Sequence, residues 1–181
     1  MSRVQTPEPG RLIISIIYSS MDGLADALKV VERKFSRVQC ETTEIPCSSA
    51  DRYLEEMGHR LSRRFFSFER PVQRDSLPEI KQFCHKTEPR FADRHGDYSF
   101  RTVNIDPGLL TAANLIVASH REYNHRIYLR DGVWAEIALI YSRNRFTRLP
   151  WTSPDYCHSD AIEFFERVRQ SLEMAEPVLH T

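Results

Sequence analysis

Residues 124–141 form the stretch that holds the best candidates for chemistry, because polar side chains stand there among apolar ones. Asp131 and Gly132 predict a two-residue type I′ turn, since both residue types tolerate the positive φ angles that this turn needs. In such a hairpin His125 and Glu136 lie on one face and diagonal to each other, at about 7 Å between backbone positions. We therefore expect an imidazole–carboxylate contact. Such a pair can hold a base in its working tautomer or supply two ligands to a divalent metal.

Four further residues extend this candidate site. Asp106 stands at the end of a predicted strand and would add a second carboxylate. Arg126 and Arg130 could clamp an anion, and Trp151, between two prolines, could line the pocket. The sequence thus predicts catalytic roles for Glu136, His125 and Asp106, and ligand-binding roles for Arg126, Arg130 and Trp151. The alternative is structural: a buried Glu136–His125 pair, an aspartate that caps a turn, and a tryptophan that packs a loop.

The ligand class follows from the charges of these residues. Arginines suit an anionic substrate, such as a nucleotide or another phosphate compound, while the acids would suit a divalent cation as cofactor. No defined metal site is predicted, because the four cysteines form no CxxC pair and the side chains of adjacent Cys-His residues diverge. Phosphate-loop, zinc-protease and dinucleotide-binding signatures are absent from the sequence.

A second hypothesis rests on residues 60–74, where arginines alternate with phenylalanines. Such a segment could bind RNA or a protein without catalysis. The formal net charge of zero argues against nucleic acid, and a strand with buried phenylalanines is the favoured interpretation.

The composition indicates one folded domain: 181 residues, of which 41% are hydrophobic and 28% charged. There is no run of about 18 apolar residues that could span a membrane. The N-terminus also lacks a secretory signal pattern. We therefore predict a cytoplasmic protein without a membrane partner, whose oligomeric state the sequence leaves open.

The pattern of apolar residues predicts an α+β fold. A strand at 12–18, a helix near 24–35 and a second strand at 38–45 come first. An antiparallel meander within residues 98–149 follows, in which Asp106-Pro107-Gly108 is expected to stop a strand, and a helix closes the chain. We predict a single-domain α/β sandwich, a mixed β-sheet packed by helices, spanning 12–176 between a flexible leader (1–11) and a tail (177–181).

Four segments together resemble a known family. They are RRFFSFE (63–69), NIDPG (104–108), HRIYLRDGVWAE (125–136) and LPWTSPDY (149–156). In this order they are similar to the bacterial family named domain of unknown function 4416, and the resemblance covers nearly the whole chain. It implies a compact, single-domain, cytoplasmic bacterial protein and carries no established activity.

Overall fold

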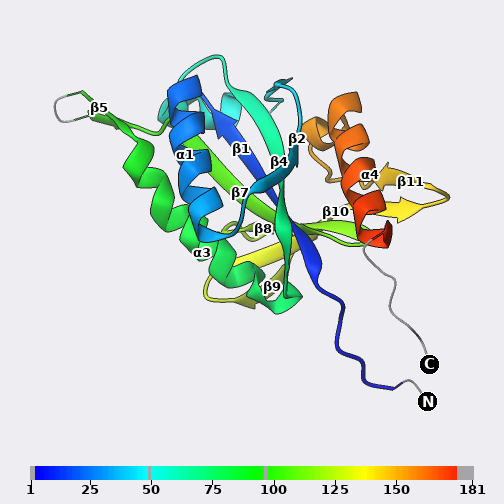
Figure 1. Ribbon diagram of the computed structural model, residues 1–181. Helices are drawn as coiled ribbons and strands as arrows, with labels where there is room; N and C mark the ends of the chain where they lie inside the picture. The colour runs from blue at the N-terminus through cyan, green and yellow to red at the C-terminus, as the bar shows by residue number, and fades with distance from the viewer. Residues whose placement is uncertain (1–2, 49, 96–97, 175–181) are drawn as a thin grey trace.

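One large sheet dominates the computed structural model, which describes residues 3–48, 50–95 and 98–174 (Figure 1). Within these residues the sheet has nine strands. They are β1 (Gly10–Tyr18), β2 (Val38–Glu41), β3 (Ile45–Pro46), β4 (Ser62–Val72), β7 (Val103–Leu110), β8 (Asn114–Ser119), β9 (Ile127–Arg130), β10 (Val133–Ser142) and β11 (Arg145–Arg148). The helices are α1 (Met21–Lys34), α2 (Leu54–Met57), α3 (Leu77–Thr87) and α4 (Ser159–Met174), and β5 (Asp93–His95) pairs with β6 (Tyr98–Phe100).

The strand order β11-β10-β8-β7-β1-β4-β2 confirms the α+β class. Its core, β1-α1-β2-β4-α3-β7 with spatial order β7-β1-β4-β2, is the split βαβ arrangement of ferredoxin-like folds. The prediction of a mixed sheet was wrong, because all pairs of neighbouring strands in the described sheet are antiparallel. The reason is that β4 lies between β1 and β2, the two strands that would otherwise pair in parallel.

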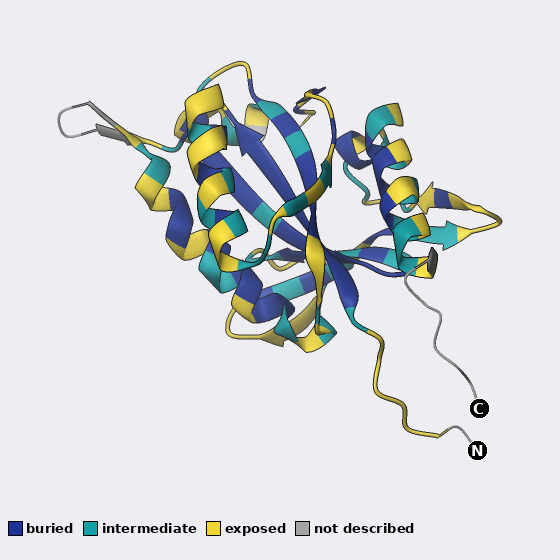
Figure 2. Cartoon of the chain, in the orientation of Figure 1, coloured by how far each residue is buried: buried dark blue, intermediate teal, exposed yellow. Residues whose placement is uncertain are grey.

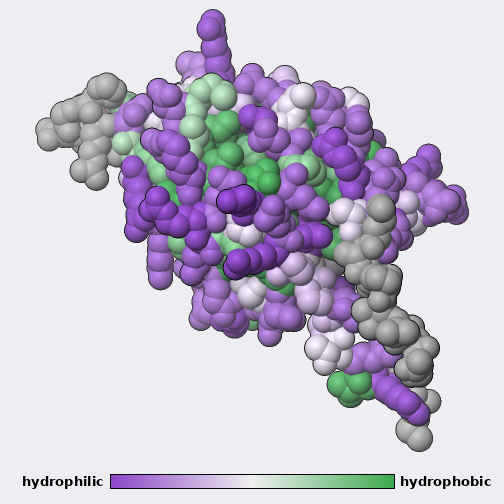
Figure 3. All heavy atoms as spheres, in the orientation of Figure 1, coloured by the Kyte–Doolittle hydropathy of each residue, from purple (hydrophilic) through white to green (hydrophobic). Residues whose placement is uncertain are grey.

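Helices cover both faces of the sheet, so β1 is buried on both sides (Figures 1 and 2). Leu12 and Ile14 pack in one core cluster with residues of α1 and α3. Ile13 points the other way, into a second cluster with Phe164 and Phe165 of α4. The alternation follows from the two-residue period of a strand. Outside these layers, hydrophilic side chains cover most of the face in Figure 3.

The arginine and phenylalanine segment forms β4, as the favoured interpretation predicted. Phe65 packs with α4, while Phe66 and Phe68 pack on the opposite face with α1 and α3, and all three are fully buried. They are therefore core residues and offer no ring surface on which an RNA base could stack.

Asp106-Pro107-Gly108 lies inside β7, so the prediction that this tripeptide stops a strand was wrong. β7 pairs with β8 only from Gly108 to Leu110, and before Gly108 the two strands separate. Proline has no backbone N–H, and at position 107 that N–H would point to the edge of β7 where β8 no longer pairs. Pro107 therefore costs the sheet no hydrogen bond. Gly108 is needed at the junction, because a Cβ there would lie 2.6 Å from the carbonyl oxygen of Ile116. The gap between β7 and β8 is where the candidate site lies.

The β9–β10 hairpin confirms the predicted turn, with φ of 54° at Asp131 and 71° at Gly132. Arg130 pairs with Val133, as a two-residue turn requires. A regular hairpin would then pair Tyr128 with Ala135, but a bulge pairs Tyr128 with Trp134 instead.

The described ends of the domain differ slightly from the prediction. β1 begins at Gly10, two residues before the predicted start, and residues 3–9 have no helix or strand. The arginine that follows Gly10 is buried, with its guanidinium donating to carbonyl oxygens of β4. The predicted tail, 177–181, lies outside the described residues.

Candidate functional site

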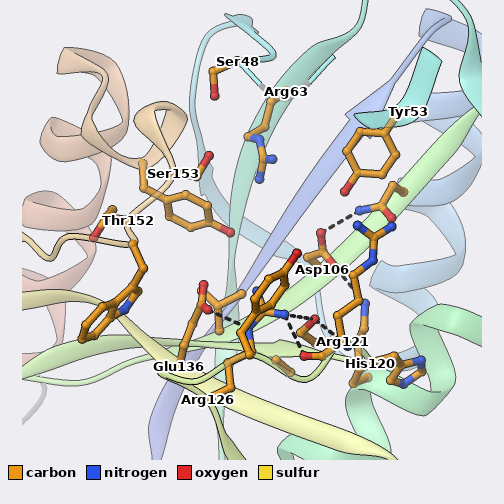
Figure 4. Close-up of a pocket in the computed structure, with 18 of the residues that line it drawn as sticks. Ser48, Tyr53, Arg63, Asp106, His120, Arg121, Arg126, Glu136, Thr152 and Ser153 are labelled. Atoms are coloured by element: carbon orange, nitrogen blue, oxygen red, sulfur yellow. Dashed lines mark hydrogen bonds and ion pairs between the residues drawn. The ribbon is translucent and has the colours of Figure 1, made fainter. Parts of the chain in front are cut away.

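A cavity of about 730 Å³ opens where β7 and β8 separate (Figure 4). Its walls come from β4, α3, β7, β8, β10, the loop after β8 and the loop before α4. Five of the six predicted site residues line it: Asp106, His125, Arg126, Glu136 and Trp151.

Side chains replace the missing strand at the open edge of β7. The backbone N–H of Ile105 donates to Oε1 of Glu88 at 2.7 Å, and the carbonyl oxygen of Ile105 accepts from Nζ of Lys81 at 3.3 Å. A buried backbone group needs such a partner. The gap therefore stays open without unpaired groups at Ile105.

Asp106 is fully engaged within the protein. Its Oδ1 accepts from Nζ of Lys81 at 2.7 Å, and its Oδ2 accepts from Nδ2 of Asn104 at 2.6 Å. Burial, the largest single effect, would raise the pKa of Asp106, but the Lys81 ammonium, the Arg63 guanidinium and the Asn104 amide together hold that pKa below its ordinary value. Burial would likewise lower the pKa of Lys81, and the Asp106 carboxylate raises it instead. Both pKa shifts favour the charged forms, so each group stabilises the charge of the other.

Arg101 joins the rim of the cavity to its floor. Its guanidinium donates to Oε2 of Glu56 at 2.6 Å, to Oε2 of Glu88 at 2.7 Å and to Oδ1 of Asn104 at 2.9 Å. The pKa of Glu88 is raised, and burial of its carboxyl group is the largest cause. The Nε atom of Arg101 is buried and has no hydrogen-bond partner in the described chain.

The predicted contact between His125 and Glu136 is confirmed, at 2.8 Å from Nε2 to Oε2. The same Oε2 accepts from Nε of Arg126 at 2.7 Å. Nδ1 of His125 is 3.2 Å from Oδ1 of Asn124, so both ring nitrogens have partners. The His125 ring is therefore held on both sides, whereas Oε1 of Glu136 makes no hydrogen bond within the described residues.

Three rings form a stack at the mouth of the cavity. The His125 ring lies between Tyr123, with ring centroids 5.7 Å apart, and Trp151, at 4.9 Å. Nε1 of Trp151 donates to the carbonyl oxygen of Ile137 at 2.9 Å, which fixes the indole against β10. Trp151 remains 39% exposed, so the stack presents an aromatic face at the cavity mouth.

The family model described as Domain of unknown function (DUF4416) matches residues 8–172. The chain belongs to the DUF4416 family. No curated protein and no solved structure matches the chain. All residues that line the cavity lie within the span that the DUF4416 model covers.

Arg130 is the one predicted site residue that this DUF4416 chain keeps away from the cavity. It forms ion pairs with Glu79 and Asp131 at the tip of the β9–β10 hairpin. The two-residue turn directs it toward α3, which carries Glu79. Its place is therefore at the hairpin–helix contact.

Three lining residues with an unpartnered buried atom were not predicted: Arg101, through Nε, His120, through Nε2, and Ser153, through Oγ. Burial is the largest cause that lowers the pKa of His120, and the positive charges of Lys81 and His85 lower it further. The signal in the sequence is weak: His120 stands two residues after the apolar run 115–118, and loops that follow strands often carry functional side chains.

The sequence also suggested a divalent cation as cofactor, but the described residues offer no ligand set for it. Among the residues that the structure describes, no group of three or more His, Cys, Asp or Glu could hold a metal ion. Each of the two predicted acids already has a cationic partner, Lys81 for Asp106 and Arg126 for Glu136. None of the described helices is long and apolar enough to cross a membrane.

Proposed function

We propose that this DUF4416 protein binds a small organic anion in the cavity between β7 and β8. The observation that carries the proposal is a set of three buried polar atoms without partners: Nε of Arg101, Nε2 of His120 and Oγ of Ser153. They come from three segments far apart in sequence, and all three residues line the same cavity. Buried polar atoms nearly always have a hydrogen-bond partner, and a bound ligand would supply it here.

The charges around the cavity favour an anion. Three of the four lining acids are neutralised by cations of the protein: Glu88 by Arg101, Asp106 by Lys81, and Glu136 by Arg126. The fourth, Asp51, forms no ion pair within the described residues. Arg121 also lines the cavity, and within the described residues it forms no ion pair. Guanidinium groups recognise phosphate and carboxylate oxygens with directed hydrogen bonds. An anion that reaches Arg121 would therefore meet a positive charge that no carboxylate of the described residues compensates.

The size and the aromatic stack fit an organic molecule such as a nucleotide or a sugar phosphate. The cavity volume of about 730 Å³ falls in the range of small-molecule sites. Oε1 of Glu136 and Nε2 of His120 are the two open atoms that could exchange a proton with the ligand, which leaves room for catalysis. We place this binding activity in the cytoplasm, in keeping with the features of the sequence.

A thermal-unfolding screen against inorganic phosphate, nucleotides and sugar phosphates tests the proposal. A ligand at a hundredfold excess over its dissociation constant should stabilise the native state by about 2.7 kcal/mol. The exposed Arg121→Gln variant should weaken that stabilisation, while Arg130→Gln, a matched change outside the cavity, should not. The proposal fails if no compound stabilises the protein, or if Arg121→Gln and Arg130→Gln respond like the unaltered chain.

A further inference from the structure

We infer that Oε1 of Glu136 binds a hydroxyl or amino group at the end of the ligand opposite its anionic group. The ligand would then be a hydroxylated or aminated organic anion, and a simple inorganic anion would fill only part of the site. This inference rests on the proposed anion-binding function and specifies the ligand class for the same cavity.

The first support is the way in which the Glu136 carboxylate is held. Its Oε2 takes both protein donors, Nε2 of His125 and Nε of Arg126. Arg126 is itself anchored, because its Nη1 donates to Oγ of Ser119 and to the carbonyl oxygen of Arg121, both at 2.8 Å. The carboxylate is therefore fixed in one orientation, and Oε1 keeps its capacity to accept hydrogen bonds.

The second support is the place of this oxygen in the cavity. The side chain of Glu136 is only 14% exposed, and it lines the cavity. Oε1 is not among the buried atoms without a partner, so it is open to the cavity, and no described residue donates to it. A hydroxyl or amino group of a ligand in the cavity can donate to it, whereas a phosphate or carboxylate oxygen would be repelled.

The third support is the separation between Glu136 and the cationic end of the cavity. Glu136 pairs with Val117 across β8 and β10, and His120 lies three residues farther along the chain from Val117. At a rise of about 3.3 Å per residue, this offset is roughly 10 Å, longer than one inorganic phosphate. Figure 4 shows the same arrangement, with Glu136 and Arg126 on one side of the cavity and His120 and Asp106 on the other.

Ser153 gives the Glu136 side a second polar atom for such a group. The loop before Ser153 is fixed to the strand of Glu136, because Nε1 of Trp151 donates to the Ile137 carbonyl oxygen and Oγ1 of Thr152 donates to that of Ala138. Figure 4 places Ser153 and Thr152 on the Glu136 side of the cavity. The buried, unpartnered Oγ of Ser153 can both donate to and accept from a hydroxyl.

Calorimetric titration with inorganic phosphate, glycerol 3-phosphate, ribose 5-phosphate and adenosine monophosphate tests the inference. We expect at least one organic phosphate to bind roughly tenfold or more tightly than inorganic phosphate, the effect of one or two added hydrogen bonds. Glu136→Gln should remove most of that advantage without weakening inorganic phosphate. Ser153→Ala should reduce it while leaving all charges in place.

Glu79→Gln is the matched control, since Glu79 forms an exposed ion pair with Arg130 outside the cavity and the substitution removes its negative charge. It should leave all four affinities unchanged. The inference is overturned if no organic phosphate binds more tightly than inorganic phosphate, or if the advantage survives in both Glu136→Gln and Ser153→Ala. If none of the four compounds binds, the proposed anion site itself is refuted.

Discussion

Replacing Asp106 by asparagine should strongly destabilise the fold, because the buried ammonium group of Lys81 then has no carboxylate partner. The side chain of Lys81 is 7% exposed and that of Asp106 is 22% exposed. Removing one partner of a buried ion pair costs about 3–5 kcal/mol, and the partial exposure of Asp106 places this pair near the lower limit. For a chain of this length, a loss of about 3 kcal/mol lowers the midpoint of thermal unfolding by roughly 6–12 °C.

Urea unfolding at pH 7 measures the change in the free energy of unfolding. Asp106→Asn should lose about 3 kcal/mol, whereas the exposed Glu79→Gln control should change little. Adding Lys81→Met to Asp106→Asn should restore part of the loss, since the uncompensated charge disappears. A loss below about 1 kcal/mol in Asp106→Asn, or a double variant less stable than Asp106→Asn, would refute the buried-pair argument.

The pH dependence of the same difference has a definite sign. The folded-state pKa of Asp106 is lowered, so its contribution is present above the ordinary aspartate pKa and is lost as pH falls through the lowered value. The folded-state pKa of Lys81 is raised, so its contribution is present below the ordinary lysine pKa and is lost as pH rises through the raised value. The stability gap between the unaltered chain and Asp106→Asn should therefore be widest near neutral pH.

Two other predictions follow from the same region. Gly108→Ala would place a Cβ 2.6 Å from the backbone oxygen of Ile116 and should cost about 1–3 kcal/mol in thermal unfolding. Gly10→Ala, whose Cβ would meet Leu109 at 3.4 Å, should cost less, and equal losses would contradict the close approach of β7 to β8. The imidazole of His120, followed by NMR during a pH titration, should titrate below the ordinary histidine pKa, because burial and then Lys81 and His85 disfavour its charged form. Its contribution to stability is present above the ordinary histidine pKa and should be lost as pH falls from there through the lowered value; a titration midpoint at or above about 6.5 would count against this.

Local chemistry made several elements of the fold predictable. The Asp131-Gly132 turn depends only on which residues tolerate positive φ, and β1 and β4 depend on runs of apolar residues. The sheet type was not predictable in this way, because the insertion of β4 between β1 and β2 is a long-range event. The Asp106-Pro107-Gly108 segment was wrongly predicted to end a strand for a related reason. Its residue types favour a turn, but β7 continues through them because β8 leaves one edge of β7 unpaired there.

In the candidate site, too, contacts set by local sequence were predictable and contacts set by long-range packing were not. The His125–Glu136 contact was predictable because the two residues flank one short turn, and their long side chains tolerate the one-residue bulge in the register. The partnership of Asp106 with Lys81 depends on how α3 packs, and the cluster of Arg101, His120 and Ser153 depends on the separation of β7 and β8. No local pattern encodes such packing.

NMR of the histidine side chains tests the binding of an organic anion in this cavity most directly. The resonances of His120 and His158 would be followed while the labelled protein is titrated with inorganic phosphate, glycerol 3-phosphate, ribose 5-phosphate and adenosine monophosphate. His120 lines the cavity and His158 does not. We predict a saturable shift of the His120 resonances with at least one organic phosphate while those of His158 stay in place. No saturable shift of His120 with any compound, or parallel shifts of both histidines, would contradict a ligand site between β7 and β8.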